Sequence, residues 1–384
     1  MKNYFYALIL FISTYANAQT TVGLYVNDFK NIIGNTASET ELLNYVQTNG
    51  FNYLILYNLT YIHNNIFSVD NITTSLPLAN FINTAKTSYG INQVAVVGEK
   101  NSSFDKIKIY NSFYPAEPNK RFDVFNLEFE FWNSNLTDPD EYYCTTYLIP
   151  NGLPCTNAGA FDFYDDQLAL MKVYGDANNI ISETYIGSPT AAQSDVITQN
   201  THRVLVHYYR TSDVYGSGES IYQYNSHRIE DLATNNNVII MPIFSGQPAH
   251  MYTWLLLNPL TQPYDTFING TNGYDDQTGD WKDNVTFDGY TWYRYTTLLE
   301  ISNTLDITTN AIEEKCVLYN EETKIITLKN FKSYSHVAVY NCNGALISSF
   351  NPRQELLLNT FETGIYIISV HTKNDVFTQK ISIQ

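Results

Sequence analysis

The sequence predicts an α/β protein in which a (β/α)8 TIM barrel is followed by a small C-terminal β-sandwich. From residue 22 to residue 305, short β-rich apolar runs alternate with longer segments of helical period. Such alternation is typical of parallel βαβ units, and eight units over this length fit a closed barrel better than an open, doubly wound sheet. After residue 307 the pattern changes to short strands separated by turns, which predicts a separate all-β unit.

Residues 1–18 have the pattern of a secretory signal peptide. Lys2 supplies a positive charge, Tyr4–Ile12 is a short apolar run, and Ala16–Ala18 is a small-x-small cleavage site. The apolar run is too short to span a membrane, and no later segment is long and apolar enough. We therefore expect a mature chain that begins near Gln19, without a membrane span.

The predicted barrel covers residues 19–306. Its strands are predicted at residues 22–26, 51–59, 93–98, 121–133, 183–186, 204–209, 238–244 and 290–295. Its helices are predicted at residues 36–48, 79–87, 163–174, 220–233 and 297–305, with Ser38 and Glu41 as a capping box at the start of the first. No glycine-rich phosphate-binding pattern follows the first strand, which weakens the alternative of a dinucleotide-binding fold.

The fourth predicted strand, R-F-D-V-F-N-L-E-F-E-F-W-N at Arg121–Asn133, carries the most informative pattern of the chain. Its odd positions are apolar: Phe125, Leu127, Phe129 and Phe131. Its even positions are polar or amphipathic: Asn126, Glu128, Glu130 and Trp132. Successive side chains of a strand point to opposite faces, so Glu128 and Glu130 share one face, roughly 6–7 Å apart. Like charges at that separation raise a pKa when they are partly desolvated, as a general acid near neutral pH requires.

An acidic face could also belong to an ordinary amphipathic strand whose polar side meets water. The barrel favours a functional interpretation, because an inward-facing barrel strand is otherwise packed with apolar residues and barrel active sites lie at the C-terminal ends of strands. We expect Glu128, Glu130 and Trp132 to lie at such an end. We also expect Glu130 to be the most perturbed carboxylate, its pKa raised by Glu128 and by aromatic neighbours such as Trp132 and Trp292.

Acidic residues outnumber basic ones, with 38 Asp and Glu against 21 Lys and Arg and a net charge of −17. This charge argues against nucleic acid or an anionic membrane as a partner and is compatible with a neutral substrate such as a glycan. The 32 Tyr and 21 Phe either pack the core or line a stacking groove. The Cys and His residues show no zinc-ligand spacing, so we expect neither a metal nor a cofactor.

Four cysteines in an exported chain suggest disulfides. Cys144 and Cys155 bracket a turn-rich segment shortly after the acidic strand, and we expect them to form a bridge that stiffens a loop over the cleft. Cys316 and Cys342 could form a second bridge.

Residues 307–314 are predicted to be a linker and residues 315–384 a β-sandwich. The strands of the sandwich are predicted at residues 316–319, 325–328, 336–340, 346–350, 356–358, 364–372 and 376–383. This unit contains no cluster of acid, base or nucleophile, so we expect it to be needed for export and dispensable for any activity.

The C-terminal unit contains V-A-V-Y-N-C-N-G-A-L-I at Val337–Ile347, G-I-Y-I-I-S-V at Gly364–Val370 and the terminal T-Q-K-I-S-I-Q. With these motifs it resembles the C-terminal sorting domain of the type IX secretion system of certain Gram-negative bacteria. The resemblance implies passage through the periplasm, recognition by the type IX secretion machinery, and release or attachment at the cell surface.

The acidic strand resembles the fourth-strand signature D-G-x-D-x-D-x-E of family 18 glycoside hydrolases, the chitinase and endo-β-N-acetylglucosaminidase family. D-V-F-N-L-E-F-E at Asp123–Glu130 matches it in spacing. The resemblance implies a TIM barrel and a glycan substrate that contains N-acetylglucosamine. It also implies Glu130 as the acid/base, Tyr208 as a hydrogen-bonding residue on the sixth strand, and Trp292 as the sugar floor on the eighth.

The chain departs from that signature at Asn126 and Glu128, where the family has Asp. The extra methylene of Glu128 moves its carboxylate by roughly 1 Å, which puts orientation of a substrate acetamido group in doubt.

The sequence therefore supports two hypotheses. The first is a secreted glycoside hydrolase in which Glu130 protonates the glycosidic oxygen, Glu128 stabilises or positions the attacking group, Tyr208 hydrogen-bonds the substrate, and Asn126, Trp132 and Trp292 contact the sugar. The second is a non-catalytic glycan-binding or cell-surface adhesion protein on the same barrel. A cleft shared by Glu128 and Glu130 and floored by Trp292 favours the enzyme.

Overall fold

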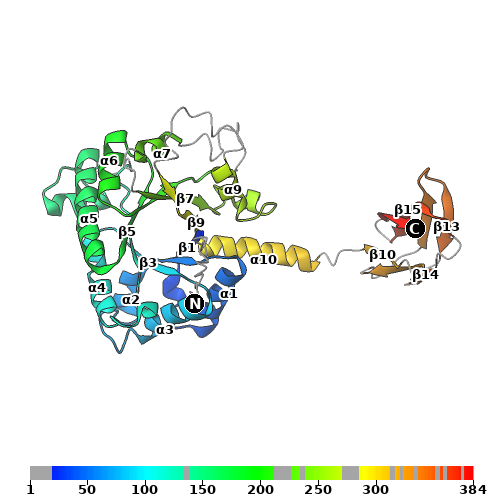
Figure 1. The fold of residues 1–384 in the computed structure, drawn as a ribbon, viewed down its shortest axis with the longest axis horizontal. Helices are drawn as coiled ribbons and strands as arrows, with labels where there is room; N and C mark the ends of the chain where they lie inside the picture. The colour runs from blue at the N-terminus through cyan, green and yellow to red at the C-terminus, as the bar shows by residue number, and fades with distance from the viewer. Residues whose placement is uncertain are drawn as a thin grey trace, which may run out of the picture. The chain divides into compact units, whose positions relative to one another are not determined.

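The computed structural model describes residues 20–133, 138–211, 226–233, 238–269, 285–311, 316–320, 323–329, 331, 336–350, 355–357, 361–372 and 376–383. The expected signal peptide lies outside the described residues. The chain divides into two compact units, Met1–Ile301 and Ser302–Gln384. Figure 1 labels the elements of both units.

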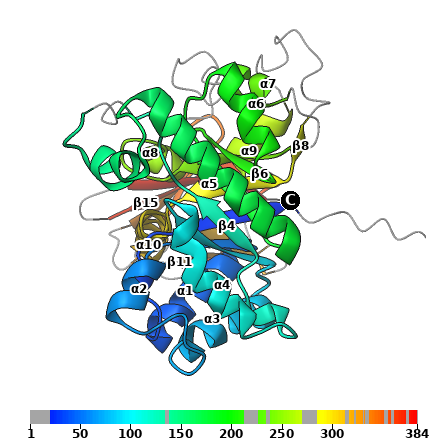
Figure 2. The same cartoon turned by 90° about the vertical axis from the view of Figure 1, so that its left-hand side faces the viewer.

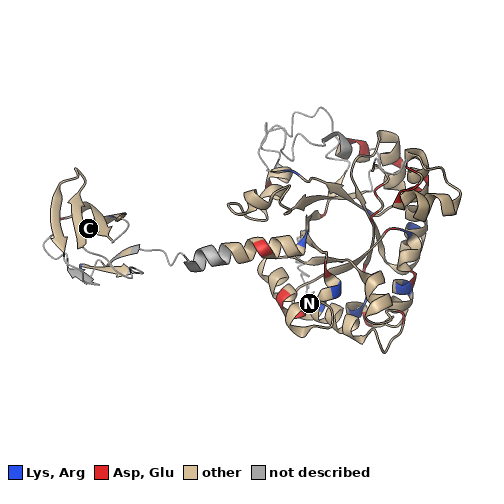
Figure 3. Cartoon of the chain, turned by 180° about the vertical axis from the view of Figure 1, so that it is seen from behind, with Lys and Arg blue, Asp and Glu red and all other residues tan. Residues whose placement is uncertain are grey.

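The first unit is a closed barrel of parallel strands, as the sequence predicts. Along the described part of the ring the strands are β1 (Thr21–Val26), β2 (Tyr53–Leu56), β3 (Gln93–Gly98), β4 (Val124–Leu127), β5 (Ile181–Ile186), β6 (Arg203–His207), β7 (Ile239–Ser245) and β9 (Gly289–Tyr293). β9 pairs with both β7 and β1, which closes the ring. The short β8 (Thr286–Phe287) pairs with β7 alone. Figure 3 shows the ring with its helices outside.

Helices cover the outside of the ring. The described helices are α1 (Thr36–Thr48), α2 (Leu59–Asn65), α3 (Leu76–Ser88), α4 (Asp105–Ser112), α5 (Asn157–Asn178), α6 (Ala191–Gln199), α7 (Ser226–Leu232), α8 (Tyr252–Leu255), α9 (Gln262–Asn269) and α10 (Tyr295–Ala311). The 22-residue α5 packs along β5 and crosses the outer face of the barrel (Figure 2).

Alternation along the strands separates two apolar cores. The larger core lies between the strands and the helices, where Leu24 of β1 and Val206 of β6 are fully buried. The smaller core joins Tyr25, Ile55 and Met241, which come from different sides of the ring, and so fills the barrel interior. Because neighbouring residues of a strand face opposite ways, a shift of one position moves a side chain from the interior to the helix layer.

The acidic segment follows this rule. Its apolar positions Phe125, Leu127, Phe129 and Phe131 are all buried in the helix-facing core. Strand β4 covers only Val124–Leu127 of the predicted strand 121–133, so Glu128 and Glu130 lie after the strand rather than within it, at its C-terminal end as expected. Asp123 anchors the other end, where its carboxylate accepts the Val94 N–H at 2.8 Å and pairs with Lys86 at 2.6 Å.

Three local predictions for the barrel are corrected. Helix α1 has the predicted bounds, but its cap is Asn35, whose side chain accepts the N–H groups of Ala37 and Ser38. The Ser38–Glu41 capping box is wrong because the helix begins at Thr36. Helices α2, α4, α6, α8 and α9 were not predicted, since all five are short. Helix α10 continues to Ala311, so residues 307–311 are helical rather than linker, and no Gly or Pro ends the helix earlier.

The second unit contains the seven predicted strands in two antiparallel sheets. One sheet comprises β10 (Cys316–Asn320), β11 (Ile325–Lys329) and β14 (Glu355–Leu357). The other comprises β13 (Leu346–Phe350), β12 (His336–Asn341), β15 (Gly364–His371) and β16 (Val376–Ile383). Val317 and Ile326 of the first sheet share a buried core with Val339 and Ile368 of the second, so the unit is a sandwich. Cys342 is a free, exposed cysteine, and the possible bridge to Cys316 is not formed.

Candidate active site

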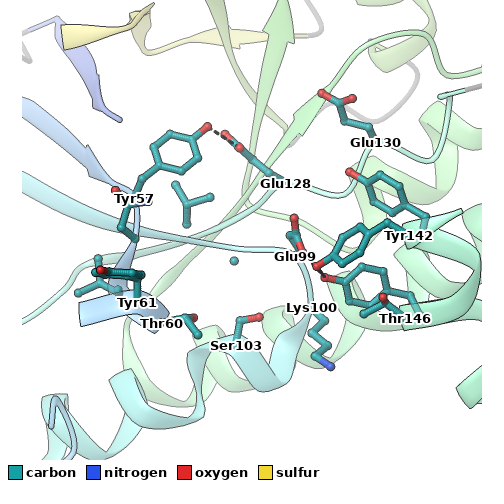
Figure 4. A pocket seen from close by; sticks show the side chains of 16 residues that line it. Tyr57, Thr60, Tyr61, Glu99, Lys100, Ser103, Glu128, Glu130, Tyr142 and Thr146 are labelled. Atoms are coloured by element: carbon teal, nitrogen blue, oxygen red, sulfur yellow. Dashed lines mark hydrogen bonds between the residues drawn. The ribbon is translucent and has the colours of Figure 1, made fainter. Parts of the chain in front are cut away.

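A cavity of about 570 Å³ opens where β2, β3 and β4 end. It is lined by Tyr57, Asn58, Leu59, Thr60, Tyr61, Val97, Gly98, Glu99, Lys100, Ser103, Glu128, Glu130, Tyr142, Tyr143, Thr146 and Tyr147. Glu128 and Glu130 therefore share one cleft at the barrel mouth (Figure 4). Carboxylates and tyrosines dominate the lining, a combination that suits a ligand with hydroxyl groups and apolar ring faces.

Glu128 has the most strongly shifted carboxyl group at this mouth. The Tyr57 hydroxyl donates a hydrogen bond of 2.5 Å to its Oε2 (Figure 4). Burial raises the pKa of Glu128 from its ordinary value of 4.5 to about 7. Hydrogen bonds from Tyr57 and Tyr25 oppose that rise, and the charges of Glu130 and Glu183 add to it. A carboxyl group with this pKa can both accept and donate a proton near neutral pH.

Glu130 lies in the loop after β4, where it lines the same cavity. Burial raises its pKa too, against a hydrogen bond with Asn133. The rise is smaller than that of Glu128, so the expectation that Glu130 is the most perturbed carboxylate is wrong. The reason is position, because Glu128 lies deeper in the barrel mouth and Trp292, expected to desolvate Glu130, lies elsewhere.

A third carboxylate, Glu99, lies in the cavity and was missed from the sequence. It follows β3 directly, and the hydroxyls of Tyr142 (3.1 Å) and Tyr147 donate hydrogen bonds to its Oε2. Tyr57 follows β2 in the same way. The position directly after a barrel strand was the available signal for both residues.

The expected disulfide between Cys144 and Cys155 is present, with Cα atoms 5.5 Å apart. Cys144 begins a π-helical turn, Cys144–Leu148, and its neighbours Tyr143 and Tyr147 line the cavity. The bridge therefore holds the segment that forms one wall of the cleft.

Asn126 lies one layer below Glu128 and is fully buried. Its Nδ2 donates a hydrogen bond of 2.6 Å to Glu183 of β5, which also accepts one from the Tyr53 hydroxyl at 2.6 Å. Arg203 of β6 completes the group, with its Nε 2.5 Å from Glu183. The predicted contact between Asn126 and substrate is therefore corrected, because Asn126 belongs to a buried polar network beneath the mouth.

Trp132 lies beside the mouth, as expected, but does not line the cavity of Glu128 and Glu130. Its partly exposed ring meets Tyr185 edge to face at 5.4 Å and covers Gly187. A Cβ at Gly187 would collide with the indole, so glycine is required at that position for the ring to lie there.

Tyr208 and Trp292 point away from the mouth, and the roles predicted for them are corrected. Tyr208 is buried against Phe267 of α9 at 5.3 Å. Trp292 is buried beside Phe244, and its Nε1 donates a hydrogen bond to the Leu260 carbonyl. Both belong to the helix-facing core. In each case the next residue of the chain packs on the barrel interior instead, Tyr209 after Tyr208 and Tyr293 after Trp292.

Tyr209 and Tyr293 form an aromatic wall on the side of the mouth made by β6 and β9. Their rings stack 5.9 Å apart, and Tyr209 lies 5.0 Å from the ring of His250. The Nδ1 of His250 is 2.9 Å from Ser245 Oγ at the end of β7. Burial and nearby Arg210 lower the pKa of His250, which favours its neutral form.

The described residues contain no group of three or more His, Cys, Asp or Glu side chains that could hold a metal ion. Among the helices of the same residues, none has the length and apolar character needed to cross a membrane.

Residues 320–384 match the family model described as the secretion system C-terminal sorting domain. This match confirms the predicted sorting domain and implies export to the cell surface or secretion. No curated relative matches the chain.

Several solved structures are similar to this chain at a low level. A modular endo-β-1,4-mannanase of glycoside hydrolase family 26 from Cellulomonas fimi has 8% identity and a TM-score of 0.42 over 95% of this chain and 93% of that chain. The PgaB (BpsB) glycoside hydrolase domain from Bordetella bronchiseptica has 9% identity and a TM-score of 0.38 over 75% and 98%. The YdjI aldolase from Escherichia coli K12 has 8% identity and a TM-score of 0.38 over 76% and 81%. Similarities this low carry no information about activity, and the expected membership of family 18 is not supported.

Proposed function

We propose that this protein is an exported glycoside hydrolase whose reaction takes place between Glu128 and Glu130. The observation that carries the proposal is the presence of two carboxyl groups with raised pKa values in one tyrosine-lined cleft at the C-terminal end of the barrel strands. Hydrolysis of a glycosidic bond needs such a pair, one to protonate the leaving oxygen and one to act as base or nucleophile or to stabilise positive charge. The sorting domain supports export, so the proposed substrate is one that the protein meets outside the cell.

The roles of the two glutamates follow from their surroundings. Glu128 suits the proton donor, because burial raises its pKa to about 7 although the Tyr57 hydroxyl donates to its carboxylate. Glu130 lies further out, in the loop after β4, and its pKa rises less. We therefore assign the general acid/base role to Glu128 and the stabilising or nucleophilic role to Glu130, which exchanges the roles expected from the sequence.

A glycan-binding protein without catalysis is the second candidate. One observation favours it: Tyr208 and Trp292, two of the expected substrate contacts, are buried outside the mouth. The tyrosines of the cleft could bind sugar rings by stacking and hydrogen bonding without any reaction.

The test is a screen of the mature protein against labelled oligosaccharides, including chito-oligosaccharides, manno-oligosaccharides and N-glycans. Glu128→Gln keeps the size of the side chain and removes the proton donor, so turnover should fall by about 10²–10⁴-fold while glycan affinity is retained. Glu230→Gln, an exposed position on α7, is the matched control and should leave turnover unchanged.

Full activity of Glu128→Gln would refute the assignment of the acid. Glycan binding without turnover, in the wild type and in Glu128→Gln alike, would instead identify a binding protein.

A further inference from the structure

A second cavity adjoins the cleft of Glu128 and Glu130. Its volume is about 280 Å³, and four of its lining residues also line the first cavity: Leu59, Thr60, Lys100 and Ser103. In Figure 4, Thr60, Ser103 and Lys100 lie along one side of the first cavity, with the two glutamates on the opposite side. A sugar chain placed over the glutamates can therefore extend into the second cavity without leaving the surface of the barrel.

The two cavities differ in charge. Three carboxylates line the first, namely Glu99, Glu128 and Glu130. The second is lined by Lys100, Lys106 and His63 together with the hydroxyls of Thr60, Ser102 and Ser103, and no carboxylate is among the described residues that line it. This local positive character occurs in a chain whose net charge is −17.

Lys100 is the cation at the junction. Lys106 is committed to Asp70 at 2.6 Å, and the same carboxylate lies 3.6 Å from His63. Within the described part of the chain, no carboxylate lies within ion-pair distance of Lys100, whose Nζ is 5.5 Å from the centre of the Tyr147 ring. Its neighbour Glu99 points the other way, toward Tyr142 (Figure 4), and also accepts a hydrogen bond from the Tyr147 hydroxyl. Lys100 is thus a partly enclosed ammonium group free to meet an anion.

We infer that the second cavity is a subsite for an anionic group on the sugar chain, with Lys100 as its cation and the hydroxyls of Thr60 and Ser103 as hydrogen-bonding partners. The ligand class is an acidic glycan, whose anion is either a uronic acid carboxylate or a sulfate ester. Both groups accept charge-assisted hydrogen bonds from an ammonium group. This inference rests on the proposed function, because it assigns the substrate class of the same site.

A binding experiment separates the alternatives. The Glu130→Gln variant is used so that the sugar is bound without turnover. Calorimetry measures its affinity for three oligosaccharides of matched length: neutral, uronate-containing and sulfated. We expect one acidic ligand to bind about tenfold more tightly than the neutral one at low ionic strength, and the preference to shrink in high salt. The uronate and sulfated arms identify which anion the subsite takes.

Variants of Lys100 assign that preference to the subsite. Lys100→Met, added to Glu130→Gln, should abolish the acidic preference by weakening the acidic ligand about tenfold more than the neutral one, while Lys100→Arg should retain the preference. Lys172→Met is the control, because Lys172 pairs with Asp176 on α5 and does not line either cavity. Equal affinity for neutral and acidic ligands would overturn the inference alone. Equal weakening of both by Lys100→Met would also overturn it, and absence of binding by any sugar would overturn the proposed function as well.

Discussion

Two glutamates in the barrel interior show how neighbours set the role of a carboxyl group. Glu183 of β5 is fully buried and meets three donors: Arg203, Asn126 and the Tyr53 hydroxyl. Glu128 lies one layer higher, where its donors are the hydroxyls of Tyr57 and Tyr25. Among the described residues no cation pairs with Glu128, whereas Arg203 pairs with Glu183 at 2.5 Å.

The difference follows from the cost of burying charge. A carboxylate taken out of water is strongly destabilised unless a cation and hydrogen bonds replace the lost hydration. Arg203 supplies that replacement at the base of the network and also reaches Asp288 at 3.4 Å. At the mouth, the described partners of Glu128 are hydroxyl groups, which donate hydrogen bonds but carry no positive charge. The pKa of Glu128 therefore rises to about 7. The lower glutamate therefore supports the fold, while the upper one is available for proton transfer.

The largest expected effect comes from breaking the lower pair. Arg203→Leu leaves Glu183 buried without its cation, so the free energy of unfolding should fall by about 3–5 kcal/mol in denaturant titrations. Lys172→Leu, which breaks the exposed pair with Asp176, should cost far less, because water screens both charges. Similar small losses in both variants would mean that the buried network does not stabilise the barrel.

The disulfide should affect the mouth more than the base. Removing it with Cys144→Ser and Cys155→Ser frees a segment of sequence separation 11, for which loop entropy predicts a loss of about 3 kcal/mol. Because Tyr143 and Tyr147 flank the bridge and line the cleft, glycan affinity should fall as well. Unchanged glycan affinity in the folded Cys144→Ser, Cys155→Ser variant would show that this wall of the cleft does not contact the ligand.

The sequence predicted the barrel and the place of its mouth, because strand periodicity and the acidic segment are local signals. Phe125, Leu127, Phe129 and Phe131 are buried as their alternation requires. The sequence did not show which residues of a strand face the barrel interior. Tyr208 and Trp292 were expected to face inward, but the tyrosines next to them in the chain do so instead. It also could not show that Asn126 would meet Glu183, because residues 57 positions apart become neighbours only through the pairing of β4 with β5.

Replacing Glu128 should make the stability of the protein less dependent on pH. A folded pKa of about 7 against an ordinary value of 4.5 means that the folded state binds the extra proton. The stability contributed by the protonated form is full below pH 4.5 and is lost as the pH rises through 7. Relative to wild type, Glu128→Gln should gain about 2 kcal/mol between pH 4.5 and pH 8, after allowance for solvent at the open cleft. A constant difference between the two proteins across this range would contradict the raised pKa.

The most direct test of the account is the titration of the Glu128 carboxyl group itself. Carboxyl carbon NMR of the protein labelled at glutamate, with Glu128→Gln to assign the signal, measures the midpoint. We expect the Glu128 carboxyl group to titrate with a midpoint near pH 7 in the wild type. In Tyr57→Phe the midpoint should be higher, because the carboxylate loses a hydrogen-bond donor. A midpoint near the ordinary value of 4.5 would contradict the account, because Glu128 would then be a plain carboxylate like those on the surface.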